Sequence, residues 1–274
     1  MINTIYLMKQ LATSLLFLST ITFAACNGMH ISMDGDLQLI KEKTFSISYG
    51  KNLSVDISSG DVIVTSWDKA EVYVKIRGNE NAMEKMDFTI EGNEEMVKIK
   101  GEKKSSVTSW FSNINVEIEI KVPAEFYVNV NTSGGDIKYG GVSGSAVLNT
   151  SGGDVWGEKF TGNLNISTSG GDISLMGGDT NINAETSGGD IKLDYKGENK
   201  GIDLSTSGGD IVIKLPEDFK ASMQLSTSGG DVSCSLNMSN VKKSSGSKLV
   251  GDINGGGEKL TAHTSGGDIT VIRR

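Results

Sequence analysis

Apolar and polar side chains alternate along most of the chain beyond residue 44, which is the period of a β-strand. The alternation is clear at Leu53, Val55 and Ile57, and again over 116–122, which reads Val-Glu-Ile-Glu-Ile-Lys-Val. From residue 128 onward, short alternating runs come in pairs that are separated by polar and glycine-rich corners. This pattern predicts an all-β protein made of many short strands.

One corner motif recurs seven times between residue 132 and the C-terminus. It reads Thr-Ser-Gly-Gly-Asp followed by Ile or Val, and its copies begin at Thr132, Thr150, Thr168, Thr186, Thr206, Thr227 and Thr264. Successive copies are 18, 18, 18, 20, 21 and 37 residues apart, so the last interval is close to two periods. Regular spacing of this length is typical of solenoids, in which each repeat is one supersecondary unit.

The residues around each motif indicate how one repeat folds. Apolar side chains stand two and four positions before the Thr, and again one and three positions after the Asp, with Gly157 as the exception. Because strand side chains alternate between two faces, these positions and the motif Thr face the same side. We therefore predict a parallel β-solenoid, a single-stranded β-helix with coils of 18–21 residues stacked about 4.8 Å apart.

The rest of the chain is assigned around this repeat. Ser58-Ser59-Gly60-Asp61 is predicted to be the corner of a first coil that has one Gly fewer. We expect residues 44–131 to form a more irregular N-terminal β region with a capping role, and residues 132–274 to form the regular solenoid. Cys234 is predicted to be a small core residue, and Trp67 and Trp156 to be packing residues near corners.

The N-terminus has the features of an export signal. Residues 11–25 are mostly apolar and follow one Lys, and they are too few to span a bilayer comfortably. Phe23-Ala24-Ala25-Cys26 resembles the lipobox of bacterial lipoproteins, although Phe23 replaces the usual Leu-like residue. We predict a signal peptide over 1–25, lipidation of Cys26 and a polar tether over 26–43. The alternative is a secretory signal with Cys26 unmodified. Translation could begin at Met8 instead of Met1, since Met8-Lys9-Gln10 looks more like an ordinary signal-peptide start.

Several segments together resemble a known family. They are Ser-Gly-Asp-Val at 59–62, Val-Thr-Ser-Trp-Asp at 64–68, Val-Pro-Ala at 122–124 and the Thr-Ser-Gly-Gly-Asp repeats. The sequence over about 39–272 is similar to the bacterial "putative adhesin" domain family of unknown function. The resemblance implies an exported envelope protein with a β-solenoid fold and no assigned catalytic residues. The lipobox resemblance adds a lipid anchor in the membrane, and the outer membrane as the expected location.

Composition and charge narrow the possible partners. The 274 residues include 35 Gly and 2 Pro, and the formal net charge is −8, which disfavours nucleic acid as a partner. Beyond Cys26 the chain has only Cys234, so the lipidated protein offers no intrachain disulfide and no Cys-x-x-Cys site.

The motif carboxylates are the most obvious candidate constellation: Asp136, Asp154, Asp172, Asp190, Asp210, Asp231 and Asp268. In the simpler interpretation they are structural turn residues that accept hydrogen bonds from corner amides or Ser hydroxyls, while Gly-Gly supplies positive φ angles. In the alternative they bind calcium, although each motif offers one carboxylate and Ca²⁺ takes six or more oxygens. They could also form an acidic stripe for a basic partner. We expect no other cofactor and no metal.

Other residues are candidates for contact with a partner. Trp110 and Phe111 lie in a basic and aromatic segment that could meet a glycan, a lipid or a protein, or could pack on the solenoid end. His30 and His263 are expected at the surface, and no clustered acids indicate an enzyme. We predict a non-catalytic, lipid-anchored envelope protein with an adhesin-like or structural role; a periplasm-facing structural or stress-sensing component is the alternative, and a polysaccharide-active enzyme the third.

Overall fold

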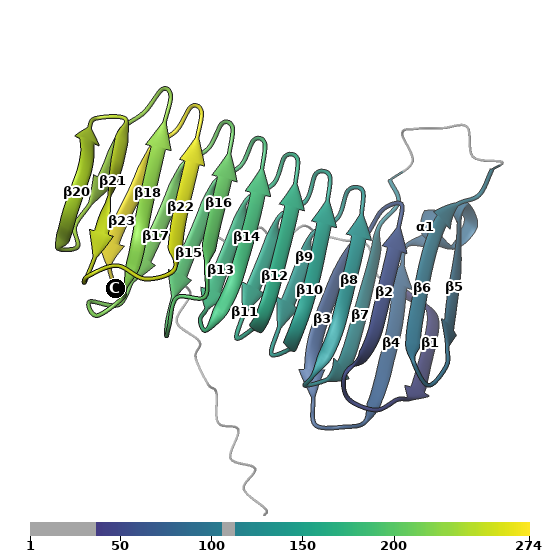
Figure 1. Ribbon diagram of the computed structural model, residues 1–274. Helices are drawn as coiled ribbons and strands as arrows, with labels where there is room; N and C mark the ends of the chain where they lie inside the picture. Colours follow the sequence, from purple (N-terminus) through teal and green to yellow (C-terminus); the bar gives the residue numbers. More distant parts are fainter. Residues whose placement is uncertain (1–36, 106–112) are drawn as a thin grey trace, which may run out of the picture. The chain divides into compact units, whose positions relative to one another are not determined.

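The computed structural model describes residues 37–105 and 113–274, which form strands, connecting turns and one short helix, α1 (Glu80–Lys85). The strands make two sheets that enclose one hydrophobic core between them. Figure 1 shows the strands of the repeat running in opposite directions on the two sides of this core. Each coil therefore gives one strand to each sheet, as expected of a β-solenoid.

The sheet with 11 strands is called sheet A. Its strands, in spatial order, are β1 (Gln38–Ser46), β4 (Glu71–Gly78), β7 (Val116–Pro123), β3 (Asp61–Trp67), β9 (Ile137–Gly140), β11 (Val155–Glu158), β13 (Ile173–Gly177), β15 (Ile191–Tyr195), β17 (Ile211–Leu215), β23 (Ile269–Arg273) and β19 (Val232–Cys234).

The 12-stranded sheet is sheet B. Its strands, in spatial order, are β20 (Met238–Ser245), β21 (Lys248–Ile253), β18 (Ala221–Thr227), β22 (Lys259–Thr264), β16 (Ile202–Thr206), β14 (Thr180–Thr186), β12 (Thr161–Thr168), β10 (Ser143–Thr150), β8 (Phe126–Thr132), β2 (Lys51–Ile57), β6 (Met96–Lys103) and β5 (Met86–Gly92).

Parallel pairing aligns equivalent residues of neighbouring coils. In sheet A the first apolar residue after each motif forms a buried row: Ile137, Val155, Ile173, Ile191 and Ile211. In sheet B the corresponding row includes Leu148, Ile166 and Ala184. All seven motif Thr residues are buried as well. The predicted inward register and the predicted solenoid are thus confirmed.

The order of the coils differs from the order of the chain at both ends of the stack. The coil of β2 and β3 lies between the coil of β6 and β7 and the coil of β8 and β9. At the other end, β22 pairs with both β16 and β18, and β23 pairs with both β17 and β19. The C-terminal coil is therefore inserted inside the stack, whereas the repeat spacing alone indicates a sequential order.

Antiparallel strands flank the parallel stack. β1 and β4 extend sheet A beyond β7, β5 pairs with β6, and the β20–β21 hairpin continues sheet B beyond β18. Because β1 begins at Gln38, residues 38–43 belong to sheet A and not to the tether that the sequence predicts over 26–43. Within the described parts of the chain, no helix is long and apolar enough to cross a membrane.

Candidate functional site

The motif corners form a hydrogen-bonded ladder along one edge of the stack. The Thr186 hydroxyl donates to the carbonyl of Gly171 in the preceding coil at 2.8 Å and accepts from the N–H of Gly189 at 3.3 Å. Thr168 and Thr206 make the same pair of contacts. The buried hydroxyl therefore has both a donor and an acceptor role, which removes the penalty of burying it.

The motif carboxylates also act between coils. Asp172 Oδ1 accepts a hydrogen bond from the backbone N–H of Asp190 in the next coil at 2.8 Å. The same contact repeats from Asp61 to Asp231, in the order 61, 136, 154, 172, 190, 210, 268 and 231. At the start of the ladder, burial raises the pKa of the Asp61 carboxyl, partly offset by the N–H of Asp136. Amide dipoles thus stabilise carboxylates whose stacking would otherwise be repulsive.

The glycines of the motif corners differ from the sequence prediction in their backbone conformation. The motif glycines are not among the residues with positive φ, so that part of the turn prediction is wrong. The second glycine is needed instead because its Cα faces a backbone carbonyl of the neighbouring coil: a Cβ at Gly171 would lie 1.9 Å from the oxygen of Gly153. Among residues 37–105 and 113–274, no cluster of three or more His, Cys, Asp or Glu side chains could hold a metal ion.

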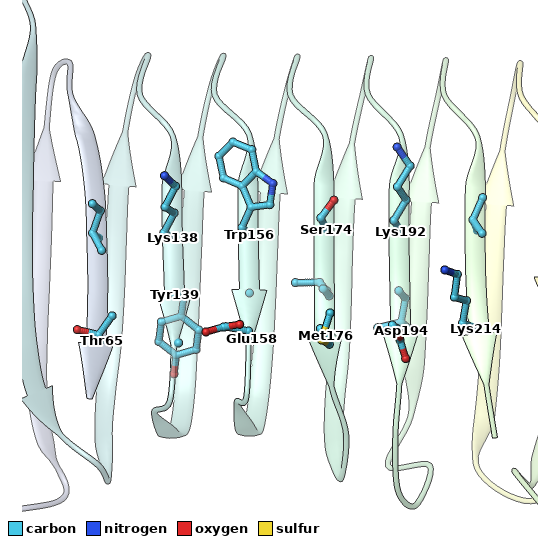
Figure 2. A pocket seen from close by; sticks show the side chains of 16 residues that line it. Thr65, Lys138, Tyr139, Trp156, Glu158, Ser174, Met176, Lys192, Asp194 and Lys214 are labelled. Carbon is cyan, nitrogen blue, oxygen red and sulfur yellow. The ribbon is translucent and has the colours of Figure 1, made fainter. Parts of the chain in front are cut away.

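A groove of ≈ 700 Å³ lies on the outer face of sheet A. It crosses the strands from β3 to β17, and Figure 2 shows its side chains in two rows, with Lys138, Trp156, Ser174 and Lys192 in one row. The second row contains Glu158, Met176, Asp194 and Lys214. We call this region the Trp156 groove.

Trp156 is the largest side chain of the groove. The sequence prediction of a packing role for it is wrong, because Trp156 takes an outward position between the inward Val155 and Gly157 and keeps 37% of its surface exposed. Figure 2 shows the broad face of the indole turned toward the viewer, beside Ser174. Met176 is 49% exposed in the neighbouring coil. Exposed aromatic and thioether groups on a rigid sheet are features of binding surfaces. Trp67, in contrast, is half-buried and donates from Nε1 to the carbonyl of Glu71 at 2.7 Å, so its packing role is confirmed.

Small residues explain why the face is hollow there. Of the two outward positions that flank β11 on each side, one holds a small residue: Gly140 on β9 lies opposite Glu158, and Ser174 on β13 lies opposite Trp156. Gly157 and Gly177 leave space on the core side, which the buried Phe160 ring fills: a Cβ on Gly177 would lie 2.8 Å from its Cε2 and Cζ atoms. The hollow is therefore confined to the outer face, and the core beneath it is packed.

Charged groups surround the aromatic centre. Lys138 Nζ lies 5.6 Å from the centroid of the Trp156 ring, within the range of a cation–π contact. Lys192 lies 3.7 Å from Asp190, and Asp194 accepts from Arg274 Nε at 2.6 Å. Beneath the groove, burial raises the pKa of the Tyr139 hydroxyl, so this group stays neutral at physiological pH.

The residues singled out from the sequence do not meet in one site. Cys26, His30, Trp110 and Phe111 lie outside the described residues. His263 is exposed on sheet B, where its Nδ1 is 3.1 Å from the Ser226 hydroxyl.

Cys234 is half-buried on the edge strand β19, where burial raises the pKa of its thiol. A thiol with a raised pKa is a weak nucleophile at neutral pH, so its position gives it no chemical role in the groove. The sequence pattern does not identify the groove residues as a binding site. They occupy outward strand positions, and the alternation of side chains shows only that they face solvent.

Comparison with known proteins agrees with this fold. The Toastrack DUF4097 family model matches residues 50–272. This chain belongs to the Toastrack family. No curated protein matches it. A solved structure named "putative adhesin" from Bacteroides fragilis is 17% identical, with a TM-score of 0.50, and the match covers 86% of this chain and 97% of that one.

Two further solved structures resemble the Toastrack chain more distantly. A "putative cell adhesion protein" from Clostridium sporogenes is 11% identical with a TM-score of 0.38, covering 86% of this chain and 100% of that chain. A "putative lipid binding protein" from Parabacteroides distasonis is 16% identical with a TM-score of 0.31, covering 85% and 96%. At 17% identity, the similarity to the Bacteroides fragilis structure concerns the fold alone and leaves the ligand of the Toastrack protein open.

Proposed function

We propose that this Toastrack protein is a non-catalytic, adhesin-like binding module, anchored by a lipid on Cys26 to the outer membrane and exposed at the cell surface. The observation that carries the proposal is the Trp156 groove, in which a large aromatic ring is held exposed on coils that the corner ladder joins from β3 to β19. The lipobox-like Phe23-Ala24-Ala25-Cys26 supports the anchor.

A binding role fits the groove better than catalysis does. Its two carboxylates belong to different coils, and Asp194 is already paired with Arg274. The motif carboxylates lie at the corners, where those from Asp136 to Asp268 accept a hydrogen bond from the backbone of the next coil and so have a structural task. General acid–base chemistry needs a pair of groups placed to meet the same bond, and neither set provides it.

Protease shaving and antibody labelling of intact cells test this proposal. We expect the wild-type protein to be labelled and shaved, and Cys26→Ala to be lost from the membrane fraction because the lipid is its attachment. Complete protection of a folded, membrane-bound protein would contradict surface exposure. It would favour a periplasm-facing structural or stress-sensing component instead.

A further inference from the structure

All lysines on strands β8 to β17 of the regular repeat lie on one of the two outer faces. Strands β9, β11, β13, β15 and β17 of sheet A carry Lys138, Lys192 and Lys214 at outward positions. Their partners in the same coils, β8, β10, β12, β14 and β16 of sheet B, contain no Lys or Arg. The charged side chains that these sheet B strands do carry, Glu185 and Asp203, are negative and exposed. This asymmetry in sign points to an anionic ligand on sheet A.

The acidic residues of the groove do not cancel this charge. Asp194 is neutralised by Arg274, whose backbone N–H is also held by the carbonyl of Leu215 at 2.9 Å. Lys192 in turn lies 3.7 Å from Asp190 of the corner ladder. Outside these two ion pairs the groove holds one carboxylate, that of Glu158, against the two lysines Lys138 and Lys214. The groove is therefore locally basic on a protein whose formal net charge is −8. This excess of positive charge favours a negatively charged ligand over a neutral one.

The arrangement along the stack suits a chain of linked rings. Lys138, Trp156, Ser174 and Lys192 occupy one row in four consecutive coils. Lys138 and Lys192 are thus three coil spacings apart, about 14 Å. The indole between them offers a flat apolar surface, which matches the face of C–H bonds on a pyranose ring, and the short Ser174 leaves the neighbouring position open.

We propose that the Trp156 groove binds an acidic polysaccharide, with one sugar ring packed on Trp156 and its carboxylate or sulfate groups paired with Lys138, Lys192 and Lys214. This proposal deepens the proposed function, since it names the ligand class of the same groove. The chain of the polysaccharide runs along the row, across the strands of sheet A. The outer face of sheet B, which carries Glu185 and Asp203 in these coils, does not take part.

Calorimetric titration of the folded protein with polygalacturonate and with heparin tests the proposal, with neutral dextran as the uncharged probe. We expect at least one acidic polymer to bind and dextran not to bind. Trp156→Ala should weaken binding about tenfold or more, because it removes the stacking surface. Lys192→Gln should weaken it about threefold to tenfold and reduce its salt dependence, because exposed ion pairs are screened.

Matched controls separate the groove from general surface effects. Val147→Ala removes a side chain that is also 37% exposed, but on sheet B, and Lys259→Gln removes a cation from β22 of that sheet. Both variants should bind as the wild type does. The proposal is overturned if neither acidic polymer binds, if the controls lose as much affinity as the groove variants, or if only anionic phosphatidylglycerol vesicles bind. Cell-surface shaving remains independent of these results, so the two proposals can fail separately.

Discussion

Gly171→Ala is expected to lower the free energy of unfolding by about 3 kcal/mol or more, while Gly170→Ala changes it by less than about 1 kcal/mol. The added Cβ at Gly171 would lie 1.9 Å from the carbonyl oxygen of Gly153 and 2.4 Å from its carbon. The same atom at Gly170 would meet the Gly152 oxygen at 3.8 Å, an ordinary contact. Relief of the clash at Gly171 requires two coils to separate, which weakens the hydrogen bond from Thr186 as well.

Urea denaturation followed by far-ultraviolet circular dichroism measures this difference. The two variants have the same composition and adjacent sites, so unfolded-state effects of replacing Gly by Ala largely cancel between them. Equal stability of Gly170→Ala and Gly171→Ala would show that the coils do not approach each other as closely as the ladder requires. The account of why each motif has a second glycine would then be wrong.

The second large effect concerns the inserted C-terminal coil. In a protein whose Cys26 and Cys234 are replaced by Ala, cysteines at Asp203 and Thr261 should form a disulfide in nearly all molecules, because these residues face each other on β16 and β22. Cysteines at Asp203 and Gln224 should not, because Thr261 lies between them. Two coil spacings are about 9.6 Å, beyond the Cα separation that a disulfide spans.

Mobility on a non-reducing gel and peptide mapping read out both pairs. A disulfide between positions 203 and 224, with none between 203 and 261, would mean that the coils stack in chain order. In that case the motif at Thr227 would contact the motif at Thr206 directly, and the C-terminal coil would lie at the end of the stack.

The solenoid itself follows from the sequence because its two signals are independent and agree. The spacing of the Thr-Ser-Gly-Gly-Asp motifs predicts the length of a coil, and the alternation around Ile173 or Leu204 predicts which side chains enter the core. The motif spacing and the alternation both depend on the local pattern of residues. The burial of the motif Thr follows from the same alternation.

The order of the coils cannot be predicted in the same way. Every motif offers the same Thr hydroxyl and the same Gly carbonyl. The Thr264 hydroxyl donates to the carbonyl of Gly209, and the Thr227 hydroxyl could make the same hydrogen bond if the coils stacked in chain order. What determines the order is the β20–β21 hairpin, which pairs with β18 and returns the chain to the gap between β18 and β16. This is tertiary information that no single repeat contains.

The groove escaped prediction for a related reason. Outward positions of a solenoid are not constrained by packing, so Lys138, Trp156 and Met176 show no periodic pattern. The nearness of Trp156 to a corner suggests a packing role. The alternation of strand side chains, with Val155 facing the core, places Trp156 on the outer face instead. Its neighbours across the strands, 18 residues away on either side, determine what kind of surface it forms.

The central claim is that the outer face of sheet A around Trp156 is the ligand-binding surface. Its most direct test is nuclear magnetic resonance of the isotope-labelled protein during separate titrations with short galacturonate oligomers and with short heparin oligomers, of which at least one must act as the ligand. The account predicts amide shift changes in β9, β11, β13, β15 and β17, centred on Trp156 and absent from Trp156→Ala. Changes centred on sheet B or on the β20–β21 hairpin, or an unchanged spectrum at saturating ligand, would contradict it.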